Sequence, residues 1–173
     1  MSWHDPSRRI VMFGLVAGLA GCGFQPLYGR MGDADANVVG HMAAIRIGPI
    51  PDRSGQLLRN ALQDKLTPRG RPGKPLYRLD VSLTENRSDL VILHDATSTL
   101  AKLRVGANYV LIDVASSRPL TRGVSKSTTV FNIVESQFAN INAQADARAR
   151  AVNAISDNIR LRLGLFFKQR QAS

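Results

Sequence analysis

Two long stretches in which apolar and polar residues alternate restrict the fold more than any other feature of the chain. The first covers residues 77–84 and the second covers residues 101–111, while residues 85–99 between them show no clear period. Successive side chains of a β-strand point to opposite faces, so a period of two predicts strands that are buried on one face and solvated on the other. The chain therefore contains an amphipathic sheet, and the apolar face of that sheet requires a second layer.

Two further strands are expected on either side of these stretches. Residues 44–47 predict a short first strand that stops at Gly48-Pro49. Ser116-Ser117-Arg118-Pro119 is a predicted turn, and residues 120–133 form a serine- and threonine-rich strand that returns from it. At Val110-Leu111-Ile112 the pattern becomes apolar on both faces, which a β-bulge or a doubly buried centre would explain.

Two amphipathic helices supply the second layer. The first is expected from Ser54, a candidate N-cap, to Leu66, and its apolar residues recur at steps of three and four. The second is expected over residues 142–163, and Gly164 either ends it or only softens it. The apolar stripe of the first helix contains Leu58, Ala61, Leu62 and Leu66, and that of the second contains Ala145, Ala149, Val152, Ile155, Ile159 and Leu163.

The order of these elements is β-α-β-β-β-α. Two amphipathic helices and one amphipathic sheet bury their apolar sides by packing together, which predicts an α+β fold. The expected architecture is a two-layer sandwich, with a mainly antiparallel four-stranded sheet and two helices on one of its faces. We expect this α+β domain to cover residues 43–167 and to be followed by a C-terminal tail at residues 168–173. The sequence assigns no role to the Phe166-Phe167 pair at the end of the domain.

The first residues predict a lipoprotein export signal. Arg8 and Arg9 precede an uncharged run from Ile10 to Ala20, which closes as Leu19-Ala20-Gly21-Cys22. These eleven residues are too few for a membrane span, which needs about 20, but they suit a signal peptide. A buried N-terminal helix with a core cysteine is the alternative, but such a helix would show a polar face and this run shows none. We therefore expect residues 1–21 to be removed and Cys22, the only cysteine, to carry lipid.

The residues that follow the cysteine read as a tether. Residues 22–42 begin with an aromatic and apolar group and continue as a polar stretch. Phe24, Leu27 and Tyr28 are the expected docking points of this tether. Stable membrane anchoring takes more than one acyl chain, and a bacterial lipoprotein cysteine carries two or three.

The net charge of +10 predicts an anionic partner. Export argues against nucleic acid and favours phosphorylated lipid, although a basic surface can also serve solubility alone. A nucleic-acid-binding protein would require the full-length chain to stay in the cytoplasm.

The sequence Leu19-Ala20-Gly21-Cys22-Gly23-Phe24-Gln25-Pro26-Leu27-Tyr28-Gly29 resembles the start of the LPS-assembly lipoprotein (LptE) family. Weaker likenesses are found in residues 52–60, 109–113 and 144–151. The resemblance implies a lipidated Cys22 and a place at the periplasmic face of the outer membrane, since Gly23 is not the aspartate associated with inner-membrane retention. It also implies a plug inside a large β-barrel partner, LptD, that helps to deliver lipopolysaccharide to the cell surface.

Lipopolysaccharide carries phosphates and carboxylates, so a basic strand face is the expected binding surface. The candidate residues are Arg78, Lys102, Arg104, Arg122 and Lys126. Arginine grips phosphate with two parallel hydrogen bonds, which makes the arginines the better candidates. An ordinary solvated face, or one lying against a barrel wall, would look the same. A second basic group in the last helix and tail (Arg148, Arg150, Arg160, Arg162 and Arg170) reads as a solvated helix face.

No catalytic, metal or cofactor site is expected. His41, His94, Asp95 and Ser98 supply residue types used in nucleophilic catalysis, but the chain has no Gly-x-Ser-x-Gly turn, and both histidines read as surface residues. After lipidation of Cys22 no thiolate remains for zinc. The alternative function is a free-standing periplasmic lipid-binding lipoprotein without a barrel partner, which predicts an apolar cavity between sheet and helices.

Overall fold

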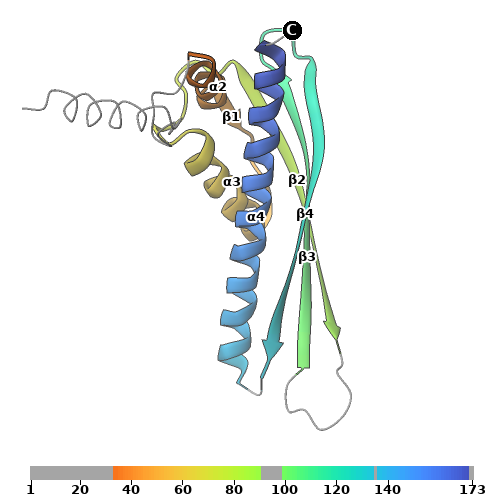
Figure 1. Cartoon of the computed structure of the whole chain (residues 1–173). Coiled ribbons are helices and arrows are strands. Elements are labelled where there is room, and N and C mark those ends of the chain that lie inside the picture. Colours follow the sequence, from red (N-terminus) through yellow and green to blue (C-terminus); the bar gives the residue numbers. More distant parts are fainter. Residues whose placement is uncertain (1–32, 91–98, 135, 172–173) are drawn as a thin grey trace, which may run out of the picture. The chain divides into compact units, whose positions relative to one another are not determined.

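The computed structural model describes residues 33–90, 99–134 and 136–171 (Figure 1). Three helices and four strands occur in these ranges. The helices are α2 (Asp33–Ala43), α3 (Asp52–Leu66) and α4 (Gln137–Gln171), and the strands are β1 (Ile45–Ile47), β2 (Tyr77–Leu90), β3 (Thr99–Asp113) and β4 (Pro119–Ile133).

The four strands form one mixed sheet in the order β1-β2-β3-β4. Strands β2, β3 and β4 are antiparallel, whereas β1 runs parallel to β2. The parallel pairing follows from the connection between the two strands. Helix α3 lies between β1 and β2 in the sequence and carries the chain back to the end of the sheet where β1 began, so β2 starts at the same end. The expected four-stranded, mainly antiparallel sheet is therefore confirmed, with one parallel edge strand.

The helices form the second layer. Helices α3 and α4 cover one face of the sheet, and α4 runs along the three long strands (Figure 1). Helix α2 packs against α4. We expected two helices, and the structure has a third, α2. It covers residues 33–43, most of which the sequence predicted to be part of a polar tether. The weak amphipathicity of this stretch left no clear helical period in the sequence.

The core lies between the two layers. The apolar residues of β3 at positions 101, 103, 105, 107, 109 and 111 are all buried, as the alternation predicted. Leu58, Leu62 and Leu66 of α3 are buried in the same core, where α3 packs mainly against α4, in agreement with the predicted stripe. The predicted N-cap is wrong, because α3 begins at Asp52 after Pro51, and the Ser54 hydroxyl instead donates a hydrogen bond to Glu85.

Strand β2 is longer than the sequence indicated. Its alternation of apolar and polar residues fades after Leu83, yet pairing with β3 continues from Tyr77 to Leu90. The partner strand β3 keeps its regular alternation here, so its backbone groups hold the polar half of β2 in the ladder. A register shift between Leu111 and Ile112 favours the β-bulge over the doubly buried centre, the two explanations that the sequence left open.

Helix α4 is longer than expected at both ends, and its buried stripe differs from the prediction. Ala145 is exposed and Ala149 is only half-buried, whereas Ala147 and Ala151 are fully buried. Gly164 does not end the helix, and it lies next to Met42 of α2: a Cβ at this position would be 3.8 Å from Met42 Sδ, an ordinary van der Waals distance. The buried residues of α4 are Ala147, Ala151, Val152, Ile155, Ser156, Ile159, Leu163 and Phe167.

The C-terminal end of α4 is held by an aromatic cluster. Phe167 is buried, stacks on His41 with ring centroids 5.3 Å apart, and lies 5.1 Å from the Tyr77 ring. The Tyr77 hydroxyl lies 3.0 Å from His41 Nδ1. His41 is therefore half-buried and packed against aromatic rings, and is not the fully solvated residue that was expected. The Phe166-Phe167 pair belongs to the packed end of the domain, with Phe166 partly buried beside it.

Candidate functional site

The five predicted basic residues all lie on the face of the sheet that carries no helix. Lys102 and Arg104 alternate with buried residues of β3, so their side chains leave the core. Arg104 pairs in register with Thr128, Lys126 with Gly106, and Arg122 with Val110, which places the β4 residues on the same face. Arg78 reaches this face from β2, because its neighbours Tyr77 and Leu79 are buried.

Three of these residues form one cluster, which we call the basic face: Lys102, Arg104 and Lys126. Residues two apart on a strand are separated by about 7 Å, and diagonal neighbours on adjacent strands by about 7–8 Å. Gly106 lies directly opposite Lys126 and has no side chain, so no neighbouring side chain of β3 covers Lys126 at this position. Arg122 lies four residues before Lys126, about 14 Å along β4, at the edge of this cluster.

The basic face has little negative charge to neutralise it. Its neighbours on β2 and β4 include Asn86, Ser88 and Thr128, which are polar and uncharged. Asp80 is the one acidic residue on the helix-free face of β2–β4, and it pairs with Arg78 at 3.1 Å. Within the described ranges, Lys102, Arg104, Arg122 and Lys126 form no salt bridge, so their charges are available to an external anion.

The structure separates Arg78 from the other predicted residues. Arg78 pairs in register with Arg46 of β1 and with Ile112 of β3, near the opposite end of the sheet from Lys102. Its guanidinium is engaged by Asp80. The five predicted residues therefore do not form one cluster. Three of them make up the basic face, Arg122 lies near it, and Arg78 lies beside the edge strand β1.

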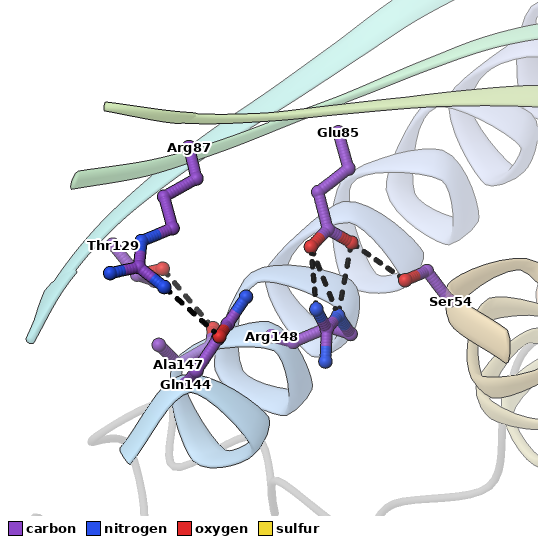
Figure 2. A network of polar contacts seen from close by, with 7 residues as sticks. All are labelled: Ser54, Glu85, Arg87, Thr129, Gln144, Ala147 and Arg148. Carbon is purple, nitrogen blue, oxygen red and sulfur yellow. Dashed lines mark hydrogen bonds and ion pairs between the residues drawn. The ribbon is translucent and has the colours of Figure 1, made fainter. Parts of the chain in front are cut away.

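The opposite, helix-facing side of the sheet holds a polar network that the sequence analysis missed (Figure 2). Arg148 of α4 clasps Glu85 of β2, with its Nη2 2.7 Å from Oε1 and its Nε 3.0 Å from Oε2. The Ser54 hydroxyl donates to the same carboxylate at 2.6 Å. These hydrogen bonds from Arg148 and Ser54 lower the pKa of Glu85, and the bond to Glu85 raises the pKa of Arg148.

Glu85 could have been placed from the sequence. It continues the phase of Tyr77, Leu79, Val81 and Leu83, so it faces the helices if the strand is extended past residue 84. Arg148 gave no such signal, because a charged residue between alanines reads as solvated. The expectation that Arg148 belongs to a solvated helix face is wrong.

The network continues toward the end of the sheet. Arg87 lies over the Phe131 ring, 5.6 Å from its centroid, and donates a hydrogen bond to Gln144 of α4 (Figure 2). Thr129 donates to the Ala147 carbonyl at 3.1 Å. Small polar residues of β4 therefore face α4, and the charges between the two layers are paired, in contrast to those of the basic face.

The remaining predicted residues lie outside the described ranges. This applies to Cys22, to the tether residues Phe24, Leu27 and Tyr28, and to His94, Asp95 and Ser98. Within the described residues, no group of three His, Cys, Asp or Glu side chains is arranged to hold a metal ion. No helix in those residues is both long and apolar enough to cross a membrane.

Comparison with protein families decides the relationship. The sequence model of the LptE family, described as lipopolysaccharide-assembly, matches residues 42–163, which is more than half of the chain. The chain belongs to the LptE family. The matched region begins after the motif around Cys22, so the resemblance seen in that motif is confirmed by independent residues. Membership makes this chain a lipopolysaccharide-assembly lipoprotein.

Solved structures share the fold of this LptE-family chain. A putative lipoprotein from Caulobacter crescentus superposes with a TM-score of 0.65 at 22% identity, over 77% of this chain and 97% of that one. A minor lipoprotein from Acinetobacter baumannii gives a TM-score of 0.51 at 15% identity, over 70% of this chain and 91% of that one. At these identities the likeness shows the fold alone. A search of curated proteins gives no significant match.

Proposed function

We propose that this lipoprotein plugs an outer-membrane β-barrel of the LptD kind and presents its basic face to lipopolysaccharide during assembly at the cell surface. The observation that carries the proposal is the basic face itself, where Lys102, Arg104 and Lys126 lie together without acidic partners in the described strands. Family membership supports the lipopolysaccharide part of the proposal.

The chemistry of the ligand suits this surface. Lipopolysaccharide presents phosphate and carboxylate groups, and Arg104 can hold a phosphate through two parallel hydrogen bonds. Lys102 and Lys126 add positive charge within about 8 Å of it. The neutral side chains of Asn86 and Thr128, which pair in register with Arg104, can donate further hydrogen bonds. Arg122 extends the surface along β4.

Anchoring completes the proposed role. Lipid on Cys22 would hold the domain at the periplasmic face of the outer membrane, which raises its concentration beside the barrel without any new contact. Phe24, Leu27 and Tyr28 would dock the start of the tether. The role requires binding and positioning only, so we propose a non-enzymatic assembly factor.

The alternative, a free-standing lipid-binding lipoprotein, requires an apolar cavity between the helices and the sheet. Side chains fill the core between the helices and the sheet: Leu58 of α3, Leu103 of β3 and Ile155 of α4 each have 0% exposure. Two pockets of the described part, near β1 and near the start of α3, have charged walls. This packing favours the plug over the acyl-chain carrier.

The proposal is tested by removing the three charges of the basic face. In the variant K102Q/R104Q/K126Q we expect copurification with the barrel to persist while lipopolysaccharide binding weakens at least tenfold. The control, R160Q/R162Q/K168Q, removes the same charge from exposed positions of α4. It should bind lipopolysaccharide within twofold of the unmodified protein.

Two results would contradict the proposal. Equal loss of lipopolysaccharide binding in both variants would show that only net charge matters. Recovery of the folded lipoprotein from outer membranes without any β-barrel would favour the free-standing alternative.

A further inference from the structure

A pocket of about 390 Å³ opens beside the outer edge of the sheet. It is formed where the edge strand β1 meets α3, the loop at residues 71–72 and the start of β2. β1 pairs with β2 on one side only, so its other edge carries no strand among the described residues. The polar residues of the pocket wall are Arg46, Arg59, Gln63, Arg71, Arg78 and Asp80, with Thr67 at the end of α3.

The charge of this pocket is strongly positive. Four arginines face one carboxylate, and that carboxylate, Asp80, is already paired with Arg78. Arg46, Arg59 and Arg71 form no salt bridge within the described part of the chain. In addition, Arg46 and Arg78 are direct neighbours in the β1–β2 register, and adjacent like charges destabilise a sheet unless an anion lies between them.

Arg59 supplies an independent observation. Its Nε is buried and has no hydrogen-bond partner in the described structure. A buried donor without an acceptor costs about 1–3 kcal/mol and is rare in folded proteins. Arg59, Gln63 and Thr67 are spaced four residues apart, so they form a row next to the buried stripe of α3 and face the rim of the domain. Arg59 also lines the pocket, so this unsatisfied donor belongs to a side chain of the pocket wall.

A second pocket of the same protein serves as a comparison, because its acidic and basic side chains neutralise one another. It has a volume of about 300 Å³ and is lined by Asp52, Arg53, Ser54, Leu83, Glu85 and Arg148. Its two acidic and two basic residues balance, and Arg148 is already clasped by Glu85. The pocket beside β1 has no such internal carboxylate for three of its arginines.

We propose that the pocket beside β1 binds a phosphate group. Guanidinium groups match the geometry of phosphate oxygens and remain charged at every physiological pH. The volume lies within the range of small-molecule sites, and the polar wall suits a headgroup or a free phosphate rather than an acyl chain. This site goes beyond the function proposed above, since it uses none of the three residues of the basic face.

The test uses the full chain in a neutral detergent, with two phosphate probes. Pyrophosphate represents free phosphate, and short-chain phosphatidic acid in the same micelles represents a lipid headgroup; phosphatidylcholine is the blank. Calorimetry measures affinity for the unmodified chain, for R46Q/R71Q, and for the control R160Q/R162Q on exposed positions of α4. The NMR resonance of the Arg59 Nε–H, assigned with R59K, reports occupancy of the pocket directly.

We expect saturable binding to at least one probe, a shift of the Arg59 Nε–H resonance, and an affinity at least tenfold weaker in R46Q/R71Q. The control should change by less than twofold. Tighter binding of phosphatidic acid than of pyrophosphate identifies a lipid headgroup, and equal binding identifies free phosphate; either supports the site. Absence of saturable binding to both probes, an unmoved Arg59 resonance in the unmodified chain, or equal weakening in both variants would overturn it. Because K102Q/R104Q/K126Q leaves this pocket intact, the two proposals fail separately.

Discussion

The pair between Glu85 and Arg148 allows a quantitative test of how the sheet and α4 are joined. We expect Glu85→Gln to destabilise the protein by about 2 kcal/mol, a value between that of exposed pairs, about 0–1 kcal/mol, and the loss of one partner from a buried pair, about 3–5 kcal/mol. The intermediate value follows from burial, because 20% of the Arg148 side chain and 23% of the Glu85 side chain are exposed. Arg148→Met should cost a similar amount, and the double variant should cost less than the sum.

Urea unfolding of the full chain measures this effect. At a typical slope of about 2 kcal/mol per molar urea, the midpoint should fall by about 1 M in Glu85→Gln. Asp146→Asn is the matched control, because Asp146 pairs with Arg150 within α4 and both side chains are more than half exposed. We expect that control to stay within about 0.5 kcal/mol of the unmodified protein.

The pH dependence gives a second test of the same pair. The pKa of Glu85 is lowered in the folded state from its ordinary value of 4.5, so its stabilisation is complete above that value and is lost as the pH falls through the folded pKa. The difference between the unmodified protein and Glu85→Gln should therefore be largest near neutral pH and shrink in acid. A difference that stays constant from neutral pH into acid, or a cost equal to that of Asp146→Asn, would refute the reasoning.

Two further predictions concern the sheet and the anchor. Gly123→Ala should lower the free energy of unfolding in urea by about 1–3 kcal/mol, because a Cβ at this position would lie 2.9 Å from Tyr109 Cε1. A Cβ at Gly40 in α2 would have no atom within 4 Å, so Gly40→Ala should be neutral or stabilising by up to about 1 kcal/mol. Equal effects of the two substitutions would contradict the packing of Tyr109 on Gly123. Cys22→Ala should abolish metabolic labelling with palmitate and leave the chain unanchored in fractionation, whereas labelling that survives this substitution would rule out Cys22 as the acylated residue.

The two faces of the sheet differ in whether their charged side chains are paired. Between the sheet and α4, Glu85, Arg87 and Arg148 all have partners, since an unpaired charge in a partly buried layer is costly. On the helix-free face, Lys102, Arg104 and Lys126 have no salt-bridge partner in the described residues, which water tolerates and an anionic ligand can use. The pocket beside β1 departs from this pattern, because the buried Nε of Arg59 has no hydrogen-bond partner among the residues that the structure describes.

The sequence by itself determined which residues share a face of β3, of β4 and of the first half of β2, and where α3 lies, because these depend on the local period of apolar residues. It therefore placed Lys102 with Arg104 on one strand face, and Arg122 with Lys126 on another, while the register of β3 and β4 shows that the two faces are continuous. It also contained the relationship to the LptE family, because residues 42–163 carry that match.

Only the tertiary structure decided the features that depend on distant neighbours. The second half of β2 is a strand because the regular, amphipathic β3 pairs with it. Helix α4 continues past Gly164, where Phe167 packs against His41 and Tyr77. Glu85 and Arg148 are 63 positions apart, and each is an ordinary polar residue until folding removes water from around it. Local periodicity encodes the direction of a side chain, but burial and pairing are set by whatever element the rest of the chain brings against it.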